Sequence, residues 1–139
     1  MNRMLDSLKV RSQRKLELID ITPQVREQVT RQGMVDGTVL VYTPHTTAGI
    51  TVNENADPAV RRDIEEFLRR NIPEEAYFDH AEGNASAHIM SSLVSASETF
   101  IIEGGRLVLG TWQGIFFCEF DGPRQRQVWL KFCRCNPGE

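Results

Sequence analysis

Short runs in which apolar and polar residues alternate dominate the first part of the chain. The earliest, over residues 8–18, predicts a strand or a hairpin, because every second side chain of a strand faces the same side. Two β-rich runs follow: TVLVYTP, which ends at Pro44, and AGITVNE at 48–54. The HTT tripeptide at 45–47 is therefore expected at the junction of two strands.

Helical patterns separate these runs. A first helix is predicted between Thr22, a capping residue, and Gly33, a residue type that commonly ends helices. The clearest helix begins at Asp57-Pro58 and keeps its apolar residues on one face, with most charges opposite. A third is predicted to begin after Asn84, a good N-cap, and to run through Leu93.

The last part of the chain is predicted to be all β. From residue 99 onward it contains the runs TFIIE, RLVLGTWQ, IFFCEF and RQVWLKF. Two or three helices among about seven strands indicate the α+β class, with mostly antiparallel sheets. The length of 139 residues fits a single compact domain over 1–139.

One carboxylate falls on an apolar side of a predicted strand. In GIFFCEFDG, Glu119 shares its side with Ile115 and Phe117. Burying a carboxylate alone is costly, so Glu119 is expected at a strand end, in an ion pair or in a site. An edge strand that leaves it in solvent is the alternative.

Composition narrows the class of protein. The formal net charge of −3 gives no basic field for nucleic acid or an anionic membrane. No apolar run approaches the roughly 18–20 residues that span a bilayer, and the N-terminus lacks the apolar region of a secretory signal. Three cysteines without a C-x-x-C pair indicate reduced thiols. We therefore expect a cytoplasmic protein with no nucleic-acid or membrane partner.

All three histidines lie in two polar stretches, TPHTTAG and HAEGNASAH. Neutral imidazole is a common ligand for divalent metals, and three histidines with one open position form a familiar catalytic arrangement. His45, His80 and His88 are thus candidate metal ligands. Alternatively, they are capping, packing or surface residues.

Further polar residues offer ligand contacts. Gly83 and Asn84 form a turn at a helix start, which is a natural place to bind an anion. Glu54 lies at a strand-to-helix junction and has no capping role, so it is a candidate for holding a cation such as Mg²⁺. Arg124 and Arg126 flank a turn and could hold phosphate, or could be solvated.

Several enzyme classes lack their motifs here. HAE matches half of the zinc deaminase signature, but the later P-C-x-x-C is absent. No phosphate-binding P-loop, G-x-G-x-x-G or G-x-S-x-G motif is present either.

Three long blocks give the chain a resemblance: PHTTAGITVNENADPAV, HAEGNASAHIMSSL and LVLGTWQGIFFCEFDGPRQRQV. In this order they resemble the YjbQ-like family, described as secondary thiamine-phosphate synthases. The resemblance covers a core of about 5–133, and only the C-terminal CRCNPGE is peculiar to this chain.

The resemblance implies an α+β domain that assembles as a homotrimer, with polar pockets near the subunit boundaries. It implies a weak activity that joins hydroxymethylpyrimidine diphosphate to thiazole phosphate and releases pyrophosphate. It also supports a clustered site for the histidines of PHTT and H-x-E-G-N-x-x-x-H. The expected catalytic residues are His45, His80, His88, Glu82 and Glu119. The expected substrate-binding residues are Thr46, Thr47, Glu54, Asn84, Trp112, Asp121 and Arg124.

Three functions remain open from the sequence. In the first, a transferase uses Mg²⁺ or a related cation, arginine and a helix N-terminus to stabilise the pyrophosphate leaving group. In the second, a hydrolase uses zinc on the three histidines, with Glu82 or Glu119 as the base. In the third, a trimer binds a small anionic metabolite without catalysis.

Overall fold

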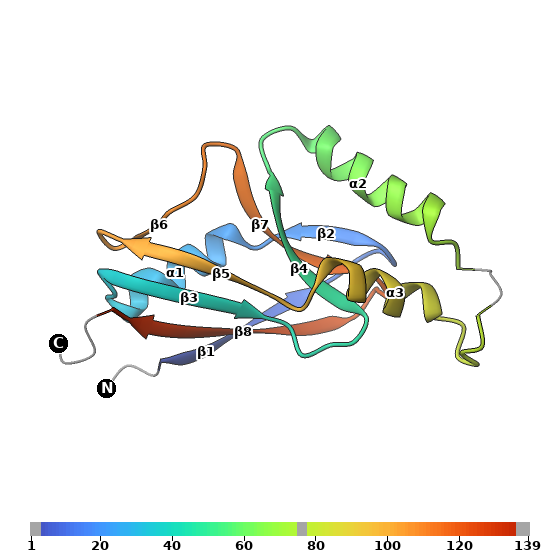
Figure 1. Cartoon of the computed structure of the whole chain (residues 1–139), viewed down its shortest axis with the longest axis horizontal. Helices are drawn as coiled ribbons and strands as arrows, with labels where there is room; N and C mark the ends of the chain where they lie inside the picture. Colours follow the sequence, from blue (N-terminus) through green and yellow to red (C-terminus); the bar gives the residue numbers. More distant parts are fainter. Residues whose placement is uncertain (1–3, 75–77, 136–139) are drawn as a thin grey trace.

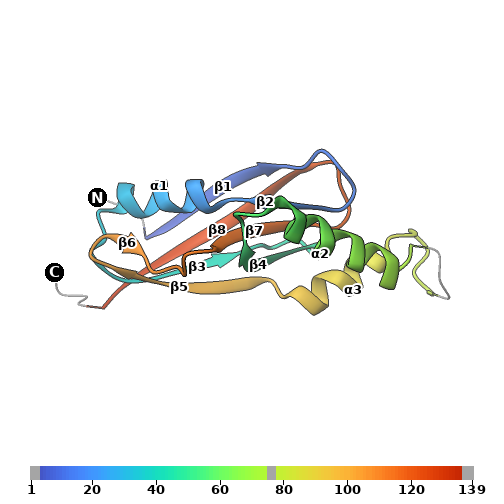
Figure 2. The same cartoon turned by 90° about the horizontal axis from the view of Figure 1, so that it is seen from above.

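Residues 4–74 and 78–135, which the computed structural model describes, form two antiparallel sheets and three helices (Figures 1 and 2). The five-stranded sheet has the order β1-β8-β3-β5-β6, and the three-stranded sheet has the order β2-β7-β4. The strands are β1 (Leu5–Arg11), β2 (Glu17–Asp20), β3 (Asp36–Tyr42), β4 (Ala48–Glu54), β5 (Ser97–Glu103), β6 (Arg106–Leu107), β7 (Gln113–Glu119) and β8 (Gln125–Arg134). The helices are α1 (Thr22–Gln32), α2 (Pro58–Asn71) and α3 (Ala85–Val94). The α+β class with antiparallel sheets is confirmed.

The three-stranded sheet is the middle of three layers. One of its faces, with Ile115 and Phe117 from β7, packs in the same core as α1 and the inner face of the five-stranded sheet. Its other face, with Phe116 and Phe120, packs against α2 and α3. Strand β7 is consequently buried on both sides, which explains its unbroken apolar sequence.

Two of the expected strand assignments hold only in part. Residues 8–18 contain strand, in β1 and at the start of β2, but the two strands do not form a hairpin, because β1 pairs with β8 while β2 pairs with β7 in the other sheet. Within RLVLGTWQ only Arg106–Leu107 is a strand before β7 begins at Gln113. Long-range partners decide both cases, and the local apolar pattern does not specify them.

The start of α1 also differs from the expectation. Thr22 lies in the first turn and does not cap the helix, because Ile21 is the N-cap residue. The Asp20 carboxylate accepts hydrogen bonds from the backbone N–H and the hydroxyl of Thr22, at 2.9 and 2.5 Å. The Thr22 hydroxyl oxygen accepts the N–H of Ile115 at 2.8 Å and thereby ties α1 to the buried strand β7.

Helix α3 lies closely on strand β4. The Ser91 hydroxyl donates to the carbonyl of Ala48 at 2.6 Å, and the N–H of Ile50 donates to the carbonyl of Ser95 at 3.1 Å. Between them, a Cβ on Gly49 would lie 2.9 Å from the Ser95 carbonyl oxygen. The absence of a side chain at Gly49 therefore permits this approach.

Among the described residues no helix is long and apolar enough to cross a membrane.

We expect Gly49→Ala to destabilise the fold and to displace α3. The added methyl meets backbone, which cannot rotate away, so overpacking should lower the free energy of unfolding by about 1–3 kcal/mol. Urea unfolding measures the loss. Gly110→Ala is the control, because the atom nearest to its added Cβ would be the Gln113 Oε1 at 3.4 Å, which is an ordinary van der Waals distance. Equal stability of the two variants would contradict close packing of α3 on β4.

Candidate functional site

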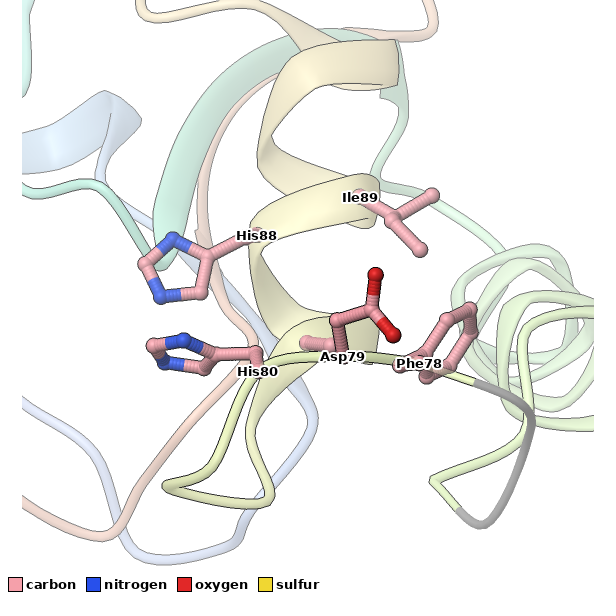
Figure 3. A pocket seen from close by; sticks show the side chains of 6 residues that line it. Phe78, Asp79, His80, His88 and Ile89 are labelled. Atoms are coloured by element: carbon pink, nitrogen blue, oxygen red, sulfur yellow. The ribbon is translucent and has the colours of Figure 1, made fainter.

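Two histidines lie together beside helix α3. His88 is in the second turn of α3, and His80 precedes the helix in the connecting loop. Their ring centroids are 5.2 Å apart and their planes cross at 84°, in an edge-to-face arrangement. Figure 3 shows the two imidazoles one above the other, with the carboxylate of Asp79 on a different side of the pocket, towards Phe78. The fold thus gathers two of the three predicted histidines directly.

This histidine pair forms part of a pocket of about 510 Å³. The lining residues are Phe78, Asp79, His80, Ala85, His88 and Ile89. Glu82 lies outside the lining, with its side chain 77% exposed and its carboxylate 3.8 Å from the His80 Nε2. In the described ranges no group of three or more His, Cys, Asp or Glu side chains is arranged to hold a metal ion. One chain therefore supplies a pair of imidazoles here and not a complete ligand set.

His45 lies in a second pocket, of about 540 Å³, which shares His88 with the first. It follows β3, and its Nε2 accepts the backbone N–H of Gln127 at 2.9 Å. Burial lowers the pKa of His45, and the positive charges of Arg126 and Arg124 lower it further against the opposing effect of Glu119. The His45 ring is therefore held neutral at the edge of this pocket.

A buried ion pair lies behind His45. Glu119 and Arg126 are 0% and 4% exposed, and the Arg126 Nε donates to both carboxylate oxygens at 2.9 and 3.1 Å. The Arg126 Nη2 also donates to Glu119, and it reaches the Thr47 hydroxyl and carbonyl at 2.8 and 3.2 Å. The Ser12 hydroxyl donates to Glu119 at 2.6 Å. Glu119 lines neither histidine pocket, so its position is that of a structural ion pair, as one of its sequence alternatives allowed.

The surroundings of Glu119 fix its charge. Burial raises the pKa of this carboxyl, but hydrogen bonds from Arg126, Ser12 and the N–H of Asp121 together lower the pKa below its usual range. A carboxylate with these donors stays ionised and has little capacity to accept another proton near neutral pH.

Arg126 is the residue whose role the sequence analysis missed. It is neither a phosphate ligand on an open turn nor a solvated arginine, because it is enclosed by Glu119 and Thr47. A usable signal was present: Arg126 alternates in phase with the core residues Val128 and Leu130 of β8, as Glu119 does with the core residues of β7. Two opposite charges on core-facing positions indicate a buried pair.

A polar cluster lies at the start of α3. The Asn84 amide donates to Asp121 at 3.0 Å, and the Arg124 guanidinium donates to the same carboxylate oxygen at 3.2 Å. Asn84 does not cap the helix with its side chain, and its Oδ1 is buried without a hydrogen-bond partner among the described residues. The Arg124 side chain is 51% exposed. Asn84, Asp121 and Arg124 are thus brought together, as a group beside the helix N-terminus.

Other predicted residues separate from the histidines. Thr46 is exposed and lines the His45 pocket, whereas Thr47 is buried against Arg126. Glu54 pairs with Gln113 at the far end of the β4–β7 ladder, and Trp112 comes directly before Gln113 in the chain. This end of the ladder is six residues along β4 from Ala48, roughly 20 Å in an extended strand. Glu54 and Trp112 therefore lie away from the histidine pockets.

Comparison with known proteins places the chain among close relatives. The family model described as "UPF0047 protein YjbQ-like" matches residues 6–135. UPF0047 protein MJ1081 of Methanocaldococcus jannaschii is 51% identical, over 93% of this chain and 94% of the relative. UPF0047 protein YugU of Bacillus subtilis is 50% identical, over 92% and 98%.

Solved structures agree in fold. A YjbQ/UPF0047 protein from Clostridium acetobutylicum, described as uncharacterized, has a TM-score of 0.90 and 48% identity, over 92% of this chain and 99% of that one. The hypothetical protein APE1520 from Aeropyrum pernix has a TM-score of 0.90 and 40% identity, over 94% and 98%. None of these names states an activity, so function has to be inferred from the site. The chain belongs to the YjbQ-like family of UPF0047 proteins.

Proposed function

We propose that this protein is a divalent-cation-dependent transferase acting on small phosphorylated molecules. The specific reaction is that of a thiamine-phosphate synthase: hydroxymethylpyrimidine diphosphate is joined to thiazole phosphate and pyrophosphate is released. The observation that carries the proposal is the pairing of His80 and His88 in a pocket beside the N-terminal part of α3.

The histidine pair suits part of a cation site. Imidazole nitrogen binds zinc readily, whereas magnesium prefers oxygen ligands. A catalytic zinc site ordinarily has three protein ligands, and His80 and His88 supply two. Water and substrate oxygens would fill the other positions, so the cation is expected to bind most tightly together with the substrate. Bound there, a divalent cation would neutralise negative charge on a diphosphate.

The chain's own residues would stabilise the same charge. The N-terminus of α3 carries the positive end of the helix dipole. The half-exposed Arg124 lies near this terminus, because Arg124 and Asn84 donate hydrogen bonds to the same carboxylate oxygen of Asp121. Such fixed positive groups favour departure of pyrophosphate, because they need no reorganisation as charge develops.

No protein nucleophile is needed for this displacement. The Cys118 thiol is enclosed in the core, where burial, with a smaller effect of Glu65, raises its pKa far above the usual range. A thiol in this state is unreactive. Cys118 also lines neither histidine pocket. We therefore propose direct attack by the thiazole nitrogen on the pyrimidine methylene, with pyrophosphate as the leaving group.

The two other functions make different demands on the same residues. A three-histidine zinc hydrolase with Glu82 as base needs His45 beside the pair, yet the His45 Nε2 already accepts the Gln127 N–H. A non-catalytic binder would bind the phosphorylated ligands without turnover.

We also propose that the protein is a homotrimer and that it is cytoplasmic. The cytoplasmic location is proposed because Cys118, Cys133 and Cys135 are all free thiols. Light scattering on the native particle should give three chains.

We expect formation of thiamine phosphate and release of pyrophosphate to require a divalent cation and His88. His88→Ala should lower the rate at least about 100-fold, since it removes one of two protein ligands. The control is Leu93→Ala on the same helix, whose side chain is 68% exposed and lines neither histidine pocket. A coupled pyrophosphate assay with and without a chelator measures both effects.

The outcomes separate the three functions. Cation-dependent turnover that is lost in His88→Ala supports the transferase. Hydrolysis of the diphosphate without joining would support the hydrolase, and saturable binding without any turnover would support the binder. Full activity of His88→Ala would contradict the proposal.

We further expect Arg124→Ala to weaken the binding of inorganic pyrophosphate. Loss of one charge-assisted contact should raise the dissociation constant at least about tenfold, since such hydrogen bonds contribute about 1.5–3 kcal/mol. Titration calorimetry at fixed cation concentration measures the change, and Arg26→Ala on α1 controls for the lost charge. Equal affinity of the two variants would remove Arg124 from the site.

A further inference from the structure

The tautomer of His45 follows from one contact. The Nε2 of its ring lies 2.9 Å from the backbone nitrogen of Gln127 and accepts the N–H. A backbone N–H only donates, so this Nε2 carries no proton. In a neutral imidazole the proton then resides on Nδ1. No hydrogen bond joins that Nδ1 to any atom in the described part of the chain.

We propose that His45 is a specificity-determining hydrogen-bond donor and not a metal ligand: its Nδ1–H binds an uncharged acceptor, such as a heterocyclic nitrogen or a carbonyl oxygen. A metal ligand must offer a free lone pair. Neither nitrogen of His45 has one, because the Nε2 lone pair accepts the Gln127 N–H and Nδ1 is protonated.

Consecutive residues of β8 hold this arrangement. Arg126 binds the hydroxyl and carbonyl of Thr47, and Gln127 binds the ring of His45. The turn after β3 is thereby attached to β8 at two points, two residues apart. Arg126 is itself fixed by the buried carboxylate of Glu119. Burial and the nearby guanidinium groups also oppose a second proton on the ring.

The chemistry of the pocket selects the ligand class. The residues that line it with His45 are Tyr42, Thr43, Pro44, Thr46, His88, Ser91, Ser92, Ser95 and Ala96. None of them is Asp, Glu, Lys or Arg, and five carry aliphatic hydroxyl groups. An uncharged polar group loses little on entering such a lining, whereas a phosphate finds no counter-charge there.

The shared residue His88 then divides the substrate between two pockets. The charged end belongs at the His80–His88 pair and the N-terminus of α3, and the uncharged ring belongs beside His45. Identification of that ring as the pyrimidine rests on the proposed function. The donor assignment rests on the Gln127 contact alone.

Nitrogen NMR on the native, ¹⁵N-histidine-labelled protein tests the donor without any ligand. We expect His45 at pH 7.5 in a single Nδ1–H form, assigned by its absence from the spectrum of His45→Gln. Added Zn²⁺ should shift the resonances of His80 and His88 and leave the His45 tautomer unchanged. An Nε2–H form, or loss of the Nδ1 proton on addition of zinc, would overturn the assignment.

Two substitutions at position 45 separate the donor from the anchor. The Gln side chain can place an oxygen where Nε2 accepts the Gln127 N–H, but it lacks the Nδ1–H. The Asn side chain can place an amide N–H near Nδ1, but it loses the anchor. We expect His45→Gln to keep the wild-type melting temperature and to bind uncharged hydroxymethylpyrimidine about three- to tenfold more weakly. His45→Asn should melt earlier and retain more of the affinity per folded molecule.

Leu93→Ala is the matched comparison, because the exposed Leu93 side chain lines neither histidine pocket. It should leave the affinity for uncharged hydroxymethylpyrimidine unchanged. Wild-type affinity in His45→Gln would overturn the donor role. Absence of pyrimidine binding by the wild type would overturn the ligand class and the proposed function, while the NMR result would still decide the tautomer.

Discussion

The ion pair between Glu119 and Arg126 joins the parts of the structure on which the site depends. Glu119 ends β7 in the middle sheet, and Arg126 lies at the start of β8 in the five-stranded sheet. Taking both charges out of water costs several kcal/mol each, so the pair persists only because its remaining hydrogen-bonding positions are also satisfied. Ser12 and Thr47 provide those partners, and each belongs to a different connection. Removal of either Glu119 or Arg126 would leave the other as an uncompensated buried charge, at a cost of about 3–5 kcal/mol.

The layered fold explains how separate segments reach one site. Because the middle sheet is covered by α2 and α3 on one face, α3 lies directly on β4. Strand β4 begins just after the turn that carries His45, so this turn and α3 lie at the same end of the sheet. His88 and His45 consequently line one pocket although 43 positions separate them in the sequence. Figure 1 shows α2 and α3 towards one end of the molecule, with α1 towards the other.

Local patterns were sufficient for most elements and insufficient for their partners. The helices begin and end close to the expected residues, because apolar period and capping chemistry act over a few positions. The pairing of β1 with β8 joins residues more than 110 positions apart, which no local pattern encodes. The same limit applies to the site. Sequence grouped three histidines, and the structure pairs His80 with His88 while β8 fixes His45 separately. The alternation of apolar and polar residues in β7 and β8 places Glu119 and Arg126 at core-facing positions. Their contact, however, depends on how the two sheets pack together.

The central claim is that His80 and His88 together bind a divalent cation at the N-terminal part of α3. Anomalous diffraction tests it most directly, with crystals grown in Zn²⁺ and data recorded above and below the zinc absorption edge. The account predicts one anomalous peak between the two imidazole rings, absent from His88→Ala crystals treated identically, with no peak on the His45 ring. A wild-type map without density between the rings of His80 and His88, or with an equal peak in the variant, would contradict it.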